Sequence, residues 1–558
     1  MAPTADDMLK AYGLQQMASA ILATYGTSAK DINAMARIGA CGHSPQHCQE
    51  NLLKLPQFKD IKVPKPSSVK AQVIKQKGSI TTVEEELVYF FKPSSWLTCL
   101  QEQGLVEQVL GGDPSPFWQQ VLRDDPKLKG IHDRGKPGWK KRRPMLIHGD
   151  AAPHQKHDSV DCYSMRSLLA PGDEGTHLYY MLLVGLPMAC RCTAKKCQEF
   201  KLVFKEDTLD TIGREIAKDL NMLYDKQELV VWVAPADCEH LAKDYGLPHY
   251  GCNDKPCMRC DGNKDSLPIS DFSAGAKWKR VMHTPEELIA RPLSYHWLLT
   301  VKGVTHFTFV YDPMHCQDIG SSSHVVANVL FDVFYKELKG NNAKKLADLN
   351  ELVKKAYDSA EVEANRRVKW VDVKHFVPNK DAPHQHYPDL QHSAIKARQT
   401  RYMVPMAFEL CKRFKRPEDE YSERRFYCLK NLNESYVIVD RHRLFIPSKD
   451  YKRYAKNIDL FLEHYTALSV MAAETEGNIG KYQWSFTPKF HFIAHIKDDA
   501  FFLSPKAFWC YGGESKVGFV STIASACLSG MPPWRVSETL CNKYRISKHM
   551  QFLQMHWE

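Results

Sequence analysis

Short continuous apolar runs, separated by polar residues, mark the middle of this chain between Arg143 and Asp237. Runs of this length, bounded by turn residues, are typical of buried strands. We expect four of them: 143–150, 177–187, 199–205 and 228–237. Apolar residues at three-to-four spacing predict an amphipathic helix over 208–225. Strands in succession, followed by a helix and another strand, predict a mixed α/β or α+β core.

Helical periodicity dominates on both sides of this core. In the first 135 residues we expect helices at 83–92, 95–110 and 116–124, with a Pro-, Ser- and Lys-rich connector at 62–78. Nearly every segment from Ser321 to about Gly480 is again helical in period. The chain is therefore expected to divide into four parts: a helical N-terminal region 1–135, a core 136–320 with a Cys-rich loop 249–262, a helical block 321–480 and a C-terminal part 481–558.

Composition narrows the class of protein. The 558 residues include 44% hydrophobic and 25% charged residues, as in ordinary globular proteins. The N-terminal segment has helical spacing in place of a basic region followed by an apolar run, so we expect no secretion signal. The longest apolar run, 178–190, is shorter than the ~20 residues that span a bilayer, and we expect no membrane span.

Cysteine usage points to a reducing compartment. The chain has 17 cysteines, an odd number, without the density of a disulfide scaffold. Free thiols or metal sites are therefore expected. We expect three of them to be thiols in a loop: Cys190, Cys192 and Cys197.

The net charge of +10 is concentrated in part in the segment "KPGWKKRRP". Such a run is commonly a solvated loop or a localisation signal. Because it precedes Asp150 in the chain, binding of a polyanion at the same place is the alternative. The basic residues concerned are Lys136, Lys140, Lys141, Arg142 and Arg143.

Acidic residues stand where predicted strands and helices begin or end. Asp150 and Asp237 each follow an apolar run, and two neighbouring strands that end in acids can hold Mg²⁺ or Mn²⁺ between carboxylate oxygens. Asp312 and His315 stand three apart after a further strand, where the acid can orient the imidazole or both can ligate a metal. Glu514 opens a predicted helix, as a dipole-compensating acid or a third ligand. Ordinary turn and cap residues are the alternative for each.

A Cys-x-x-Cys pair, Cys257 and Cys260, is a signal for structural zinc, with buried thiols in a tight turn as the alternative. Zinc needs two more ligands. His491 and His495 are four apart, but we expect them to be core or polar-network histidines. Our candidates for the remaining ligands are Cys252, His249, His315 and Cys316, of which Cys252 is closest to the pair.

Taken in order, these segments resemble the transposases of the CACTA and Plavaka-like groups of cut-and-paste DNA elements, especially divergent forms from protist genomes. The resemblance covers roughly residues 140 to 545. It rests on six motifs in order: "HGD", "ADCEHL", "GLPHYGCNDKPCMRC", "DPMHCQDIGSSSHVVANVL", "PKFHFIAH" and "GGESKVGF". It implies a ribonuclease H-like catalytic core, a DDE acid triad and a helical insertion before the last acid.

By this resemblance Asp150, Asp237 and Glu514 match the three acids, and Asp312 and His315 match the D-x-x-H signature between the second and third acids. The chain departs from the family at Ala236, where a Gly is usual, and in "GGES", which lacks an aromatic residue before the Glu. Two alternatives therefore stay open: Asp312 in place of Asp237, and Glu474 or Glu476 in place of Glu514.

The resemblance implies a metal-dependent enzyme that cleaves DNA and transfers strands, using two Mg²⁺ or Mn²⁺ ions, with zinc as a further structural metal. Its partners would be transposon ends and target DNA, contacted by 136–143 and by the basic segment 355–375. The expected localisation is nuclear, otherwise cytoplasmic, and whether the chain forms a homo-oligomer stays open. The candidates for base stacking are Trp139, Trp370 and Trp484.

Two other classes of function compete with this interpretation. One is a domesticated or inactive relative that binds nucleic acid or protein without cutting. The presence of candidates for all three acids favours activity, but no DNA-binding finger or helix-turn-helix is obvious in 1–130, so specific recognition of DNA ends is unaccounted for. The other is a zinc-stabilised structural protein in which the acids are unrelated.

Overall fold

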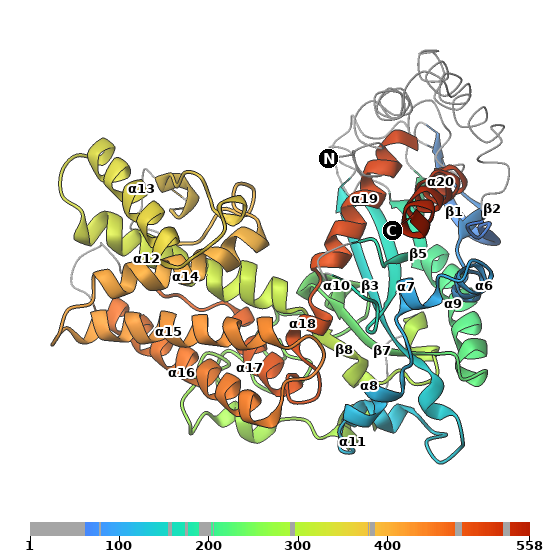
Figure 1. The fold of residues 1–558 in the computed structure, drawn as a ribbon, viewed down its shortest axis with the longest axis horizontal. Coiled ribbons are helices and arrows are strands. Elements are labelled where there is room, and N and C mark those ends of the chain that lie inside the picture. The colour runs from blue at the N-terminus through green and yellow to red at the C-terminus, as the bar shows by residue number, and fades with distance from the viewer. Residues whose placement is uncertain are drawn as a thin grey trace, which may run out of the picture.

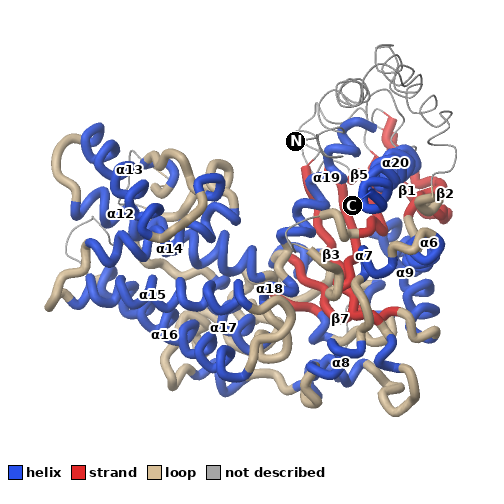
Figure 2. The backbone as a smooth tube through the Cα atoms, viewed as in Figure 1, coloured by secondary structure: helices blue, strands red, loops and turns tan. Residues whose placement is uncertain are grey.

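A computed structural model describes most of the chain as two lobes (Figure 1). The sheet lobe contains all the described strands, and the helical lobe is built from the helices between Ser322 and Asp499 (Figure 2). The residues described are 62–77, 80–153, 159–172, 177–188, 202–204, 206–290, 296–377, 379, 386–474, 482–527 and 536–557.

The sheet lobe is organised around a five-stranded mixed sheet with the order β5-β4-β3-β7-β8. β4 pairs antiparallel with both β3 and β5, whereas β7 runs parallel to β3 and to β8. β7 is buried at every position, as expected for a parallel strand covered on both faces. The bounds are Arg143–Pro153 for β3, Ser159–Ser167 for β4, Met181–Met188 for β5, Leu229–Ala236 for β7 and Phe309–Tyr311 for β8.

Most of the predicted core elements are confirmed, and the fold class is α+β. The runs 143–150, 177–187 and 228–237 overlap β3, β5 and β7, of which β3 continues three residues further than predicted, and the amphipathic helix at 208–225 is α9, Glu206–Asp225. The run 199–205 contains β6, Leu202–Phe204, which belongs to a second, three-stranded sheet. β4 was not predicted, because its sequence SVDCYSMRS lacks an apolar run.

The hairpin of β1 (Ser67–Lys77) and β2 (Ile80–Phe90) corrects the expectation for the N-terminal region. A connector and a helix were predicted here, and both predictions were wrong. Val88 and Phe90 are buried and two positions apart, so their period is that of a strand, while Val83 and Leu87 are about half exposed. The expectation of helices in residues 1–61 lies outside the described residues.

Helices cover the sheet and fill the rest of the lobe. α19 packs on β3 and β4, and α20 packs on β2 and β5. Each therefore ties the C-terminal part of the chain to strands that precede the helical lobe. The bounds are Pro93–Glu102 for α6, Val106–Leu110 for α7, Ser115–Gln120 for α8, Cys238–Lys243 for α10, Pro285–Ala290 for α11, Pro505–Phe508 for α18, Tyr511–Cys527 for α19 and Val536–Trp557 for α20.

The helical lobe follows β8 through a π-helical segment, Met314–Ser321. A buried ion pair joins its first helix to its fourth, since Arg425 Nη1 lies 2.8 Å from Asp332 Oδ2. None of the described helices is long and apolar enough to cross a bilayer. The bounds are Ser322–Asp332 for α12, Asn342–Ser359 for α13, Ala397–Arg413 for α14, Glu420–Arg441 for α15, Ser448–Ala473 for α16 and Pro488–Asp499 for α17.

Candidate functional site

Three carboxylates meet at one end of the central strands. Asp150 lies near the end of β3 and Asp237 directly follows β7, and these two strands are parallel neighbours whose carboxyl ends share one edge of the sheet. Glu514 lies in the first turn of α19, which packs on β3. The Asp150 carboxyl group is near enough to Glu514 to raise its pKa. Asp150 is thus close enough to both Asp237 and Glu514 for their charges to interact.

The charges of these acids act on one another. Burial and, after it, the charge of the Asp150 carboxylate raise the pKa of Glu514 to about 8, while His315 opposes the rise. Burial also raises the pKa of Asp150, an effect that His240 counteracts and Asp237 reinforces. Clustered, partly buried carboxylates of this kind are stabilised in the ionised state by a nearby cation.

Asp312 has a different role from the other acids. It is fully buried, and Oδ1 accepts hydrogen bonds from the backbone N–H of Met314 (3.1 Å) and of Cys510 (2.8 Å). Its Oδ2 accepts from the backbone N–H of His315 (3.0 Å) and lies 2.6 Å from His315 Nδ1. Four such contacts occupy both oxygens, so Asp312 orients His315 and joins β8 to the loop before α19.

Asp237 is better placed than Asp312 to hold a cation. Its Oδ1 caps α10 by accepting a hydrogen bond of 2.6 Å from the backbone N–H of His240. Among the described residues, none donates a hydrogen bond to Oδ2 of Asp237. This geometry favours Asp237 over Asp312 as the second acid.

Two histidines border Glu514. Nε2 of His315 lies 3.9 Å from Glu514 Oε1, and Nε2 of His148 lies 3.7 Å from the same oxygen. Burial tends to lower the pKa of His315, but the hydrogen bond to Asp312 and the surrounding carboxylates raise it to about 10. Burial and then the charge of His240 lower the pKa of His148 to about 3. One imidazole is thus positively charged at neutral pH and the other is neutral.

A glycine permits the approach of α19 to β3. A Cβ atom built on Gly513 would lie only 2.5 Å from Cγ of His148 and 2.6 Å from its Nδ1. His148 is 1% exposed and has no room to move away. The backbone just before Glu514 therefore has no space for a side chain where it meets β3.

A second cluster, Cys257, Cys260, His491 and His495, can hold a metal ion such as zinc. Their ligand atoms all lie within 4.8 Å of one another, and all four residues are buried. Cys257 Sγ is 3.3 Å from His495 Nε2, Cys260 Sγ is 3.2 Å from His491 Nε2, and the two Nε2 atoms are 3.0 Å apart. Around tetrahedral zinc these ligand atoms are separated by about 3.3–3.8 Å.

The surroundings of this cluster suit thiolate ligands. The backbone N–H groups of Arg259 and Gly262 donate to the sulfur atoms of Cys257 and Cys260, at 3.3 and 3.4 Å. Burial opposes ionisation of Cys257, but the hydrogen bond from Cys260 and the charges of the two imidazoles lower its pKa well below the usual value. The ring of Trp278 packs edge-on against both imidazoles and shields them from solvent.

The residues of this cluster differ in part from those expected. Cys257 and Cys260 are included, but Cys252 is exposed and lies outside the group. The positions expected for Cys252 and a second partner are taken by His491 and His495, which we had expected to be core or polar-network histidines. Their i, i+4 spacing on α17 was the available signal, because it puts both rings on one face of a helix.

The basic cluster of 136–143 lies away from the acids. Arg143 starts β3, so the seven-residue rise along the strand separates it from Asp150 by roughly 23 Å. Arg142 is 1% exposed and pairs with Asp133, with Nη2 2.7 Å from Oδ2. Arg143 donates to the carbonyl groups of Gly111 and Gly112. Only three residues of the cluster are exposed: Lys136, Lys140 and Lys141.

The remaining candidate residues differ in how far they are buried. Trp484 is fully buried and donates a hydrogen bond to the Tyr421 hydroxyl, so it is a core residue, whereas Trp139 is partly buried and packs against Trp118 at the edge of the core. Trp370 is 52% exposed. Glu474, an alternative third acid, is exposed at the end of α16. Four candidates lie outside the described residues: Glu476, Cys190, Cys192 and Cys197.

Comparison with protein-family models and with curated proteins finds no match to this chain. The chemistry of the site is therefore inferred from its geometry.

Proposed function

We propose that this protein is a DDE-type transposase-like enzyme that cleaves phosphodiester bonds in DNA and transfers strands, with a ribonuclease H-like core. The observation that carries the proposal is the convergence of Asp150, Asp237 and Glu514 from a strand end, a neighbouring strand end and a returning helix. The mixed sheet and the helical lobe between β8 and α19 agree with the implied layout.

The three acids fit a pair of divalent cations. Their donors are carboxylate oxygens, which Mg²⁺ and Mn²⁺ prefer, and the raised pKa of Asp150 and of Glu514 reflects a burial cost that a cation offsets. When bound, such a pair supplies activation of the attacking oxygen and stabilisation of the leaving oxygen in an in-line displacement at phosphorus.

The chain's own residues supply orientation and a proton. Asp312 holds the imidazole of His315 through Nδ1, so that Nε2 faces Glu514 and keeps its proton at neutral pH. In the proposed reaction this proton lies beside the carboxylates, where it can be donated to a phosphate or leaving oxygen. His148 is neutral and fully buried, so it packs against Glu514 without adding charge.

We also propose that the Cys257, Cys260, His491 and His495 cluster binds structural zinc. Cys260 and His491 are 231 residues apart in the sequence. The metal would therefore join the loop after α10 to α17, two segments between which most of the helical lobe lies in the chain. Tyr311 of β8 stacks on Phe492 at 4.1 Å, so the same junction borders the strand that leads to Asp312.

The test is cleavage and strand transfer on labelled duplex and branched DNA with Mg²⁺ or Mn²⁺. Asp150→Asn, Asp237→Asn and Glu514→Gln should each lose activity by several orders of magnitude while retaining the fold. Glu474→Gln is the matched control for Glu514→Gln and should cut like the wild type. Titration calorimetry with Mn²⁺ provides a second readout, since the three variants should lose binding of the ion.

The competing classes of function give different results. A binding module would bind DNA or protein but show no cleavage at any metal concentration, and the acid variants would not change its affinity. A zinc-stabilised structural protein would neither cleave nor bind Mn²⁺ at the acids. Either result would refute the proposed enzyme.

A further inference from the structure

A basic side chain of the helical lobe reaches the helix that carries Glu514. The guanidinium of Arg398, in the first turn of α14, lies over the ring of Tyr511 at 5.4 Å from its centroid. Tyr511 precedes Glu514 by three residues, about 4.5 Å along the helix. Arg398 is exposed. A positive charge that is exposed to solvent therefore contacts the residue one helical turn before the acid.

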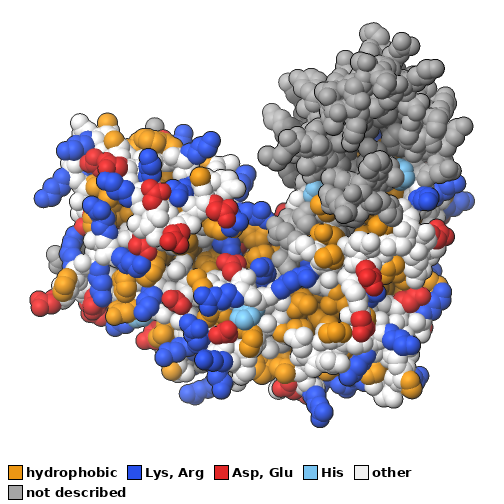
Figure 3. Space-filling model, viewed as in Figure 1, with side chains coloured by type: hydrophobic (Ala, Val, Ile, Leu, Met, Phe, Trp, Pro, Cys, Tyr) orange, Lys and Arg blue, Asp and Glu red, His pale blue; other side chains and the backbone are white. Residues whose placement is uncertain are grey.

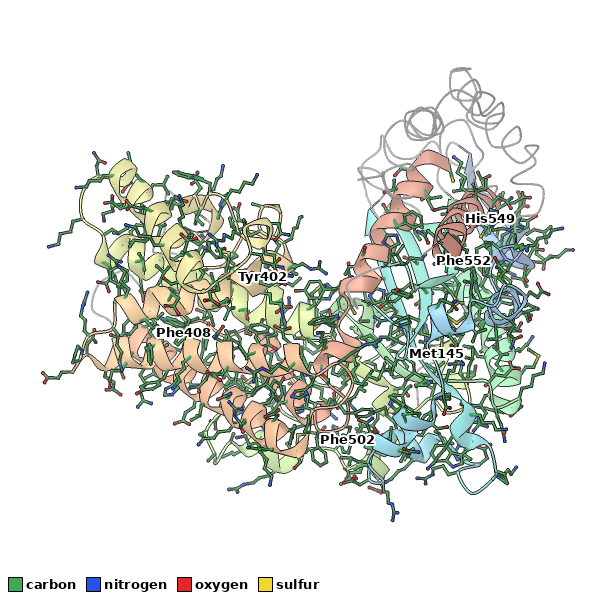
Figure 4. The ribbon with its side chains drawn as sticks, in the orientation of Figure 1. Met145, Tyr402, Phe408, Phe502, His549 and Phe552 are labelled. Carbon is green, nitrogen blue, oxygen red and sulfur yellow. The ribbon has the colours of Figure 1, made fainter. Side chains whose placement is uncertain are left out.

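The next contact leads outward along the helical lobe. Tyr402, one turn after Arg398 on α14, accepts a hydrogen bond of 2.7 Å from Arg366 Nη1, and the Arg366 guanidinium lies 4.8 Å from its ring centroid. Arg366 is itself exposed, and its Nε lies 3.0 Å from Glu363 Oε2, so its charge is shared with that carboxylate. Figure 4 labels Tyr402 on the part of α14 nearer to α19. Tyr402 is thus one helical turn from Arg398 and in contact with Arg366.

An exposed tryptophan, Trp370, follows Arg366 in the chain, on a loop that is hydrogen bonded to α13. Asn350 of α13 accepts from the N–H of Val371 at 2.8 Å and donates to its carbonyl at 2.9 Å. Val371 is buried, whereas its neighbour Trp370 is 52% exposed, and no described aromatic ring stacks on it. Lys369 and Lys374, on either side of Trp370, are also exposed. The residue after Trp370 is thus held to α13 by two hydrogen bonds, and exposed lysines stand near Trp370 in the sequence.

We propose that these residues form a track that binds single-stranded DNA next to the cleaved bond, with a base stacked on Trp370. The inference rests on the proposed function for its location beside the acids. The track consists of Arg398, Tyr402, Arg366, Lys369 and Trp370.

The chemistry of the track selects this ligand. Exposed cations spaced along a surface attract the phosphate backbone, and an unstacked indole offers a face to any unpaired base. Bases in a duplex are stacked on one another and do not present that face, so the tryptophan favours single strands. Lys and Arg side chains are spread over the visible face of the helical lobe (Figure 3). Within this group Arg398 contacts Tyr511 of α19, and Arg366 contacts Tyr402 of α14.

The experiment measures binding of fluorescently labelled oligonucleotides, without Mg²⁺ or Mn²⁺ and without a chelator, so that binding is separated from cleavage and the cysteine and histidine cluster is undisturbed. Trp370→Ala should weaken single-stranded DNA binding about tenfold, and Trp370→Phe should restore most of it. Duplex binding should change less than twofold. Removing Arg366, Lys369 and Arg398 together should lower the slope of log Kd against log salt by about 2.

The matched control is the double variant Lys140→Ala/Lys141→Ala, which removes exposed charge at the other end of β3. It should leave the single-strand affinity and the salt slope unchanged. The proposal is overturned if this control accounts for the salt slope, if Trp370→Ala binds normally, or if the track binds RNA in preference to DNA. Track-dependent DNA binding without cleavage under catalytic conditions would support the track and refute the proposed enzyme, so the two failures are distinguishable.

Discussion

Gly513 should be essential to the geometry of the acids. In Gly513→Ala the new Cβ would lie 2.5 Å from His148 Cγ, whereas ordinary van der Waals contact begins at 3.4 Å. The start of α19 must therefore retreat by about 0.9 Å, because His148 is packed on all sides. The displacement is transmitted to Glu514, which is the next residue in the chain.

Two effects of this substitution can be estimated. Overpacking a filled interior costs about 1–3 kcal/mol in the free energy of unfolding. A 1 Å misplacement of a catalytic group lowers the rate about 100-fold. Alanine has the better intrinsic helix propensity, by up to about 1 kcal/mol, so a net loss of stability in this variant would have to come from the contact with His148.

Gly518 provides the matched control. It lies one turn further along α19, is exposed, and an added Cβ would meet nothing within 4 Å. Gly518→Ala should therefore be as stable as the wild type or up to about 1 kcal/mol more stable, with unchanged cleavage. Urea denaturation, Mn²⁺ titration and DNA cleavage measure the stability, the cation affinity and the rate.

The reasoning is refuted if Gly513→Ala matches Gly518→Ala in stability and cleaves within threefold of the wild type. A double-mutant cycle tests the cause of any loss. In a His148→Ala background the clash is removed, so Gly513→Ala should there cost no further stability. An equal cost in both backgrounds would show that His148 is not the obstacle.

Three further predictions concern the metal cluster, a buried lysine and a buried arginine. Cys257→Ser should lose one bound zinc per chain by elemental analysis and lower the melting temperature, whereas Cys252→Ser should change neither; retained zinc in Cys257→Ser would exclude the cluster. Lys548 is fully buried, and burial lowers its pKa from 10.5 to about 7, so between these values the unfolded chain binds a proton that the folded chain does not. Stability should therefore rise from pH 7 towards 10.5 by up to about 1.4 kcal/mol per pH unit, and Lys548→Met should remove this contribution in urea denaturation; an identical pH profile would contradict the assignment. Arg142→Ala removes the buried partner of an ion pair with the partly exposed Asp133 and should cost about 1–3 kcal/mol of unfolding free energy, against less than about 0.5 for the exposed Lys140→Ala; equal effects would mean that Arg142 is not structural.

The elements that were predicted correctly are those with a clear hydrophobic pattern in their own sequence. β3, β7 and α9 have apolar runs or helical spacing that predict them without any partner. β2 was predicted as a helix because three or four apolar residues in a short segment fit both periods. β4 was missed because its buried polar residues, among them Ser164 and Arg166, sit in a strand enclosed by two others.

The sequence by itself determined which residues stand at strand ends and helix starts, because Asp150, Asp237 and Glu514 follow or begin recognisable local patterns. Which of these residues meet was decided only by the tertiary structure. It joins His491 and His495 to cysteines more than 200 residues earlier, and it buries Arg142 within a run that looks uniformly exposed. The physical reason is that hydrogen bonds, metal ligands and burial depend on distances in space, and long-range pairing of strands and helices sets those distances independently of local periodicity.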